Sequence, residues 1–522
     1  MKTSLRGIVT IIIVTSALVC FILTLAGAKK NTGITVNPWD AIADINAAID
    51  TYDVVNFNPG TYNLGDDRFI VDHKSVILRG ISDAAGNKPK IIGNGFFVAG
   101  VNKHVVLVYA PGESVEIDNL RIESTPTFFN TGALVNIASD YFKVINCEII
   151  CSVPDEENVN WTSALWVLSY KYAGLSDAIV TGDVIIKDTE VSHNSKWEGA
   201  GIRISDGGGE ERHPLDSIEI KSCTVDAPYA VWGILLENSS DENTTTTVSK
   251  CTIDSTSPFM ISGLKGNLYA HSLDLVSRFP HWGGYKTGMI ISGDANGIIN
   301  DININIYLEE GGPQNLLGDY AILLGHFDYW YGYSLIHGCR NKVFNNITVE
   351  GTARWMVFSL VYSKLPNLAP VTNNVIKNIR RENLIVNQYE YLLAGPGTHN
   401  YDNVIIDNYV AEDGSFARIY DGSSQPQAAW MAAWMAESTV TPWGTFSNSD
   451  VLGWYGGDGA MNVWYHNCDP SGPQDWCPPG WDPSSGLCCF LSSPPFPPQE
   501  IYDGGANILR GRLQKLYGIV GD

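Results

Sequence analysis

Charged side chains that could carry out acid–base chemistry gather around one glycine-rich loop. Arg203 and Asp206 stand just before the run Gly207–Gly209, and Glu237 follows at the end of the next similar segment. Carboxylates in such a cluster could act as a general acid or base. No nearby residue is fixed as a nucleophile or base, however, and Arg203 with Glu237 is more simply a surface ion pair. The catalytic residues are therefore left unknown, with Arg203, Asp206 and Glu237 as candidates.

The sequence lacks the local motifs that mark common catalytic sites. It contains no Gly-x-Ser-x-Gly nucleophile turn, no His-Glu-x-x-His zinc motif and no phosphate-binding loop. No metal site and no cofactor are expected, and calcium binding stays open without a specific motif to indicate it. Whether the chain is an enzyme also stays open.

Aromatic side chains are the second group with functional chemistry. They cluster beside strand starts and in long loops, where exposed rings could stack on sugar faces or anchor a protein interface. The alternative is that they pack the loops onto the body of the protein. The candidate contacts are Trp197, Trp232, Trp282, Tyr285, Trp330 and Tyr331.

A repeated structure must position these residues, because two short patterns alternate along the chain. The first contains a polar or Asn/Asp position followed by a small or apolar one, as in Ile117–Ile122 and Val144–Ile149. The second begins with glycine and then alternates apolar positions, as Gly-Ile-x-Ile at Gly201–Ile204 and as Gly-Met-Ile-Ile at Gly288–Ile291. Both are β-branched and bounded by turn residues, which predicts strands. Stacked repeats of this kind bury a continuous core that one repeat cannot.

These patterns resemble those of the pectin-lyase-like superfamily of right-handed parallel β-helices, over residues 37 to 415. The resemblance implies an all-β solenoid with a short N-terminal capping helix and a Cys/Trp/Pro-rich C-terminal cap. It implies little about activity, because the architecture hosts polysaccharide lyases, hydrolases, esterases and several non-enzymatic roles. Some enzymes of this superfamily have a pair of aspartates accompanied by further motifs, and these further motifs are absent from this sequence. The Arg-x-Pro-x-x-Arg pattern of other enzymes in the superfamily is absent as well.

The N-terminal cap is predicted from local signals. Asn37 and Pro38 are expected to begin a short helix in which Ile42, Ile45 and Ile49 share one face. Such a helix would cover the apolar core and the unpaired backbone at the open end of the solenoid.

One outward row of the Gly-Ile-x-Ile strands is unusually apolar. If Ile202 and Ile204 point inward, Arg203 points outward. The matching outward positions are Val167, Leu235, Met260, Ile290 and Leu323. A strand that is apolar on both faces is normally covered on both, so we expect long loops, the C-terminal segment or another copy of the chain over this row.

Composition and the first residues bear on location. The chain has 522 residues with 44% hydrophobic and 17% charged residues, and its net charge of −23 excludes nucleic-acid binding. Basic residues, the apolar run Ile8–Leu25 and Ala26–Ala28 predict an export signal cut after Ala28, with an uncleaved membrane anchor as the alternative. The rest is expected outside the cytoplasm. Candidate glycosylation sites are Asn160, Asn238 and Asn243.

The ten cysteines fall into groups with different expected roles. Cys147, Cys223 and Cys251 share one repeat position that points inward, which favours buried thiols over disulfides. A loop-rich segment near the C-terminus predicts two disulfides of unknown pairing. Its cysteines are Cys468, Cys477, Cys488 and Cys489.

Two functions from different classes remain. The first is an exported cell-surface β-helix with a structural, self-assembling or glycan-binding role, whose partners are polysaccharide or other copies of itself. The alternative is a secreted polysaccharide lyase or glycoside hydrolase. Membrane contact is expected only through the N-terminal segment. The expected units are residues 1–28 (signal peptide or anchor), 29–62 (N-terminal cap), 63–415 (β-helix) and 416–522 (C-terminal disulfide-containing cap, lid or assembly module).

Overall fold

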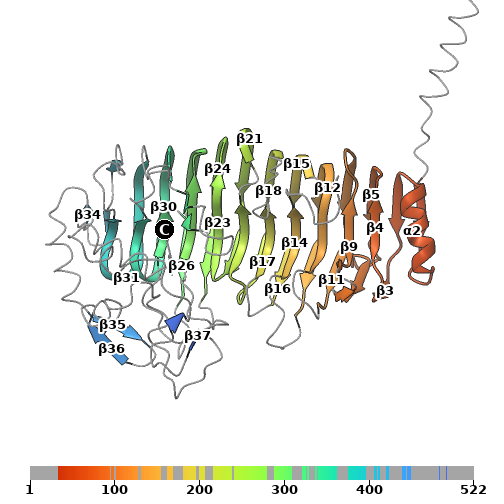
Figure 1. The fold of residues 1–522 in the computed structure, drawn as a ribbon, viewed down its shortest axis with the longest axis horizontal. Coiled ribbons are helices and arrows are strands. Elements are labelled where there is room, and N and C mark those ends of the chain that lie inside the picture. The colour runs from red at the N-terminus through yellow and green to blue at the C-terminus, as the bar shows by residue number, and fades with distance from the viewer. Residues whose placement is uncertain are drawn as a thin grey trace, which may run out of the picture.

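The computed structural model of the chain shows an elongated stack of short strands, with a helix at one end (Figure 1). It describes residues 33–94, 96–98, 101–126, 131–153, 162–168, 180–194, 199–205, 215–237, 240–278, 287–307, 320–324, 326–327, 336–337, 339–360 and 374–394, and several short strands after residue 404. Within this part of the chain, the one helix, α2 (Ile42–Thr51), is too short to cross a membrane.

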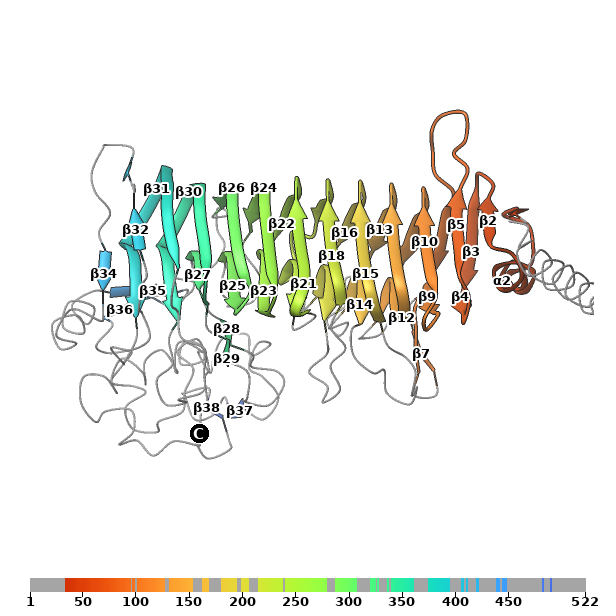
Figure 2. The same ribbon diagram turned by 90° about the horizontal axis from the view of Figure 1, so that it is seen from above.

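Strands of successive coils pair in parallel and form three ladders that run the length of the stack (Figures 1 and 2). The first ladder contains β4 (Phe69–Asp72), β9 (Val106–Tyr109), β12 (Gly132–Ile145), β14 (Thr162–Leu168), β17 (Gly199–Ser205), β20 (Trp232–Glu237), β23 (Ser257–Leu264), β25 (Thr287–Gly293), β27 (Tyr320–Leu324), β30 (Lys342–Leu360), β31 (Val375–Ala394) and β34 (Ile419–Asp421). The parallel β-helix expected from the sequence is confirmed.

The other two ladders share their longest strands with each other or with the first. The second contains β1 (Gly33–Val36), β2 (Val54–Phe57), β5 (Val76–Gly80), β10 (Ser114–Asp118), β12, β15 (Val180–Lys187), β18 (Leu215–Lys221), β21 (Ser240–Ser249), β24 (Asn267–Ser277), β26 (Asn296–Ile306), β30, β31 and β32 (Ile405–Asp407). The third contains β3 (Thr61–Gly65), β6 (Lys90–Gly93), β11 (Arg121–Ser124), β13 (Glu148–Cys151), β16 (Glu190–His193), β19 (Thr224–Asp226), β22 (Thr252–Ser255), β24, β26, β30, β31 and β33 (Val410–Ala411).

Among the described residues, four antiparallel strand pairs stand apart from the ladders. They are β7 (Phe96–Val98) with β8 (Val101–Lys103), β28 (His326–Phe327) with β29 (Ile336–His337), β35 (Ser438–Thr441) with β36 (Gly444–Ser447), and β37 (Trp481–Asp482) with β38 (Cys489–Phe490).

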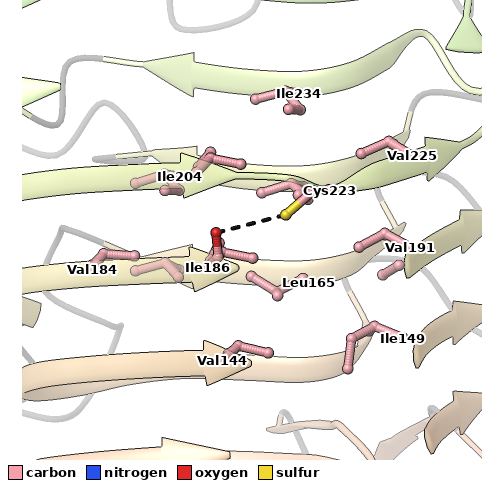
Figure 3. Packing of buried hydrophobic residues seen from close by; sticks show 14 of the residues in the cluster. Val144, Ile149, Leu165, Val184, Ile186, Val191, Ile204, Cys223, Val225 and Ile234 are labelled. Atoms are coloured by element: carbon pink, nitrogen blue, oxygen red, sulfur yellow. Dashed lines mark hydrogen bonds between the residues drawn. The ribbon is translucent and has the colours of Figure 1, made fainter. Parts of the chain in front are cut away.

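The core is a single apolar interior enclosed by the ladders. In β15, buried and half-buried residues alternate along the whole strand, as expected when one face of a strand meets the core. Figure 3 shows how side chains from successive coils, among them Ile186, Cys223 and Val225, meet inside. The apolar side chains of stacked coils thus bury one another, whereas a single coil would leave them exposed to water.

From β10 to β30, the corner between the second and third ladders contains one residue in the left-handed conformation. In eight coils its φ lies between 48° and 56°, and the residue that follows it is buried. Asn and Asp adopt this conformation more readily than most residues, which explains the polar position of the repeat. The corner residues are Asn119, Asn146, Asp188, Ser222, Lys250, Ser272, Asp301 and Asn346.

The N-terminal cap differs from the sequence prediction at its start. Ile45 and Ile49 of α2 are buried, as predicted, but the helix begins at Ile42 after a turn. The Asp40 carboxylate accepts the backbone N–H of Asn37 at 2.7 Å. Asn37 is therefore a turn residue, and its prediction as the helix N-cap was wrong.

The cysteines of the repeat lie inside, as predicted. Cys147, Cys223 and Cys251 are free thiols, each no more than 1% exposed, and Cys151 and Cys339 are also free and buried. Burial raises the pKa of the Cys147 thiol to about 12. Cys468, Cys477 and Cys488 lie outside the described residues, and Cys489 is described only as part of β38, so their disulfides stay a prediction.

Candidate functional site

The first ladder carries the outward row in which sequence reasoning placed Arg203. Strand pairing aligns Arg203 with Leu235, which in turn aligns with Met260. On the other side Arg203 pairs with Trp166, whereas Val167 pairs with the inward Ile204. The prediction that Val167 points outward was therefore wrong by one residue. The row continues through Ile290 and Leu323 as predicted.

This row is covered, whereas the outward face of the second ladder is not. Every residue of β14, β17 and β25 is buried, although successive side chains of a strand point to opposite faces. In β24 of the second ladder, by contrast, the outward residues are exposed or half-buried. The expectation of a covered row is confirmed, and the burial arises within a single chain.

Arg203 lies at the centre of a polar cluster within this apolar row. Its Cζ atom lies 5.0 Å from the ring centroid of Trp166, and one of its terminal nitrogens lies 3.3 Å from Glu237 Oε2. Arg203 Nε donates to the hydroxyl of Ser205 at 3.1 Å. The same hydroxyl accepts the indole N–H of Trp166 at 3.4 Å. Three adjacent coils contribute to the cluster, which we call the Arg203 cluster.

The ion pair predicted between Arg203 and Glu237 is present, but it is not on the surface. The side chain of Arg203 is 3% exposed and that of Glu237 is 13% exposed. A guanidinium removed from water requires a partner charge and further hydrogen bonds, and this cluster supplies both. The geometry suits a structural pair better than an acid–base couple, because the carboxylate is engaged by the cation beside it.

Two buried histidines also lie beside the first ladder. His193 Nε2 lies 2.9 Å from Thr162 Oγ1, and burial lowers the pKa of His193 to about 4. His104 Nδ1 accepts the backbone N–H of Gly132 at 3.2 Å. Burial, followed by the charge of Arg68, lowers the pKa of His104 to about 3. Both imidazoles are therefore neutral at pH 7 and serve packing and hydrogen bonding.

The structure places only some of the residues proposed from the sequence. It brings Arg203 and Glu237 together, puts the half-buried Trp232 at the start of β20, and exposes Asn243 on β21. The other candidates lie outside the described residues: Asp206, Trp197, Trp282, Tyr285, Trp330, Tyr331, Asn160 and Asn238. Across the residues that are described, no group of three or more His, Cys, Asp or Glu is placed to hold a metal ion.

Sequence reasoning missed Lys342, which is completely buried. Its ammonium donates to the backbone carbonyls of Gly293 (3.0 Å), Arg340 (2.7 Å) and Ala295. Strand pairing sets Gly297 beside it, and a side chain on Gly297 would collide with the lysine stem. The repeat could have indicated this burial, because Lys342 occupies an inward position and pairs with a glycine that leaves room for its side chain.

Comparisons with known proteins give no family for this chain. No family model matches it, and no curated protein matches it. The Dettilon tailspike protein gp208 is 13% identical, with 74% of this chain and 64% of the tailspike covered and a TM-score of 0.34. The chain thus spans less than two thirds of that protein.

Two enzymes of known structure are similar at the same low level. The A-module of the mannuronan C-5 epimerase AlgE6 of Azotobacter vinelandii is 11% identical, with 65% of this chain and 94% of the module covered and a TM-score of 0.29. Pectate lyase Pel9A is 9% identical, with 78% and 85% covered and a TM-score of 0.24. At these values no activity transfers to this chain.

Proposed function

We propose that this chain is an exported protein of the cell surface or extracellular layer, with a structural, self-assembling or glycan-binding role. The observation that carries the proposal is the outward row of the first ladder. It is apolar, it is covered within the chain, and the charge of Arg203 in it is matched by Glu237.

A site that cleaves polysaccharide needs acid and base groups that reach the same bond. Among the described residues, the Arg203 cluster pairs Arg203 with Glu237 below the surface. The long outer faces of a stack of coils suit a role that depends on surface, such as binding or assembly. The apolar run near the N-terminus supports export.

The test is to purify the exported chain and measure assembly, binding and turnover together. Sedimentation and negative-stain electron microscopy report assembly, and a panel of extracellular polysaccharides reports binding and released product. Ordered sheets, tubes or filaments, or binding without product, would support the proposal.

Two outcomes would overturn it. One is product from a polysaccharide that is lost in folded Arg203→Ala and Glu237→Ala variants, which would favour a lyase or hydrolase. The other is a small monodisperse species that neither binds nor cleaves any member of the panel.

A further inference from the structure

The exposed face of the second ladder changes its chemistry along the stack. In the coils before β21 its central outward row holds the charged residues Glu116, Lys143 and Glu219 together with the apolar Ile185. Lys143 Nζ lies 3.0 Å from Glu116, and Glu219 lies 2.8 Å from the Nζ of Lys187, which belongs to the neighbouring outward row. From β21 onward the same row, followed by strand pairing, contains no charge: it holds Thr247, Tyr269, Ile298 and Val343.

The uncharged part of this row is open to solvent. Tyr269 is 41% exposed, and Ile298, its partner on the next strand, is 50% exposed. Tyr269 and Ile298 pair on adjacent strands, so together they form a small contiguous apolar surface within the described part of the chain. The strands that carry them, β24 and β26, lie side by side in Figure 1.

A parallel row of polar side chains lies beside the exposed ring. His271, Asn300 and Asn345 align across β24, β26 and β30. The amide of Asn345 donates to Asn300 Oδ1 at 2.6 Å, and the amide of Asn300 donates to Asp301 Oδ2 at 2.6 Å. One of these bonds joins two coils and the other joins adjacent residues, and together they hold the amides in fixed orientations before anything binds, which lowers the entropy that binding must overcome.

We propose that this surface, the Tyr269 platform (Thr247, Tyr269, Ile298, Val343, Asn300 and Asn345), binds an uncharged polysaccharide. The inference rests on the glycan-binding role proposed above and gives that role a place on the molecule. An aromatic ring offers a flat apolar face to a sugar, and oriented amides offer donors and acceptors to its hydroxyl groups. Three steps between coils make the central row roughly 14 Å long, enough for a short stretch of sugar chain.

The charges on and around the platform argue against an anionic polysaccharide. None of the six platform residues carries a charge, the exposed corner residues beside it include both Asp301 and Lys250, and the whole chain has a net charge of −23. The platform itself thus offers no cation to a carboxylated sugar, and the net charge of the chain repels an acidic polymer, whereas neutral hydroxyl groups can bond to the amides. Two exposed apolar side chains also fall far short of the roughly 800 Å² per partner of a stable protein interface, so a second copy is a poor occupant of this surface.

The test measures binding of the full exported chain to cello-oligosaccharides, N-acetylchito-oligosaccharides, manno-oligosaccharides and oligogalacturonates by calorimetry. Tyr269→Ala is expected to weaken binding of the neutral ligand by about tenfold, and Tyr269→Phe, which keeps the ring, to stay within about twofold. Tyr229→Ala is the matched control, because Tyr229 is similarly exposed, at 39%, but lies in a turn outside the platform.

Each other outcome overturns the inference, and the outcomes are distinguishable. If Tyr269→Ala leaves the affinity for the neutral oligosaccharide unchanged, the Tyr269 platform is not the binding site, but the proposed function still holds. Binding of oligogalacturonates alone contradicts the charge argument. If no polysaccharide binds and Tyr269→Ala dissociates an oligomer in sedimentation, the platform is an interface between copies. If there is neither binding nor assembly, the inference and the proposed function fall together.

Discussion

The guanidinium of Arg203 lies over the indole ring of Trp166, 5.0 Å from its centroid, on the covered face of the first ladder. Strand pairing in register places them opposite each other in adjacent coils. Ser205 hydrogen-bonds to both side chains, so one hydroxyl fixes the ring and the cation together. A buried charge is thereby held by packing as well as by its carboxylate partner.

Arg203→Met should destabilise the fold by about 3 kcal/mol, because it leaves the Glu237 carboxylate largely buried without its cation. The double variant with Glu237→Gln should recover part of this loss. Urea unfolding measures both. Lys187→Met is the control, since its pair with Glu219 is about one-third exposed and should be worth less than about 1 kcal/mol. Equal losses in the two single variants would contradict the buried role.

The two buried histidines should make stability depend on pH. The pKa of His193 is about 4 in the fold against 6.5 in the unfolded chain, so only the unfolded state takes up a proton as the pH falls below 6.5. The stability that His193 contributes is complete above pH 6.5. It is lost toward pH 4, at about 1.4 kcal/mol per pH unit.

His193→Gln should therefore flatten the fall in unfolding free energy between pH 6.5 and 4. His104→Gln should do the same down to about pH 3, where the pKa of His104 lies. Unfolding curves at a series of pH values test this, and the double variant should show both effects. A slope identical to that of the unchanged protein would sink the prediction.

Native protein should protect its interior thiols from alkylation. Burial raises the pKa of Cys147 and Cys151 to about 12, and that of Cys339 to about 11, so almost no thiolate exists at pH 8. Iodoacetamide should leave these three unmodified in the native chain and modify them fully in denaturant. Peptide mass spectrometry reads the result, and native labelling at the rate of an unfolded peptide would count against it.

Gly233→Ala should destabilise the chain by about 1–3 kcal/mol through overpacking. A β-carbon at this position would lie 2.7 Å from the carbonyl oxygen of Pro258 and would collide with Ile253 across the interior. Gly33→Ala is the control, because its nearest neighbours lie at 3.7 Å, an ordinary contact. Thermal unfolding of both variants decides the point: similar melting temperatures would show that the coil can relax around the added methyl group.

Much of the fold could be predicted because the repeated pattern marks the strands and the positions that point inward. Cys147, Cys223 and Cys251 were placed inward from their shared position, and the structure buries all three. The Gly-Ile-x-Ile segments predicted strands, and the structure adds why glycine stands in them. At Gly233, as in the equivalent Gly201 and Gly288, a side chain would collide with a strand of the third ladder or its neighbour.

Other features were not readable from pattern alone. Alternation placed Val167 outward, but only the register of β14 against β17 shows that Trp166 meets Arg203. The start of α2 was misplaced because the Asp40 side chain, not that of Asn37, satisfies the backbone at the turn. The row was expected to be covered, but Arg203 and Glu237 were expected to form a surface ion pair, because the sequence does not show which segment lies over their coils. The Tyr269 platform was missed for a related reason, since exposure is decided by distant segments.

The ladders also bear on how the chain reaches its folded state. In the described ladders, each inner strand pairs with a strand of the coil before it and a strand of the coil after it, and β1 with α2 lies at the N-terminal end of the stack. These pairings span about one coil of sequence, and each finished coil presents an edge on which the next strand can pair. We therefore expect the coils to fold one after another from the N-terminal end while the chain is being synthesised. The first coils should be stable before the last coils have been made.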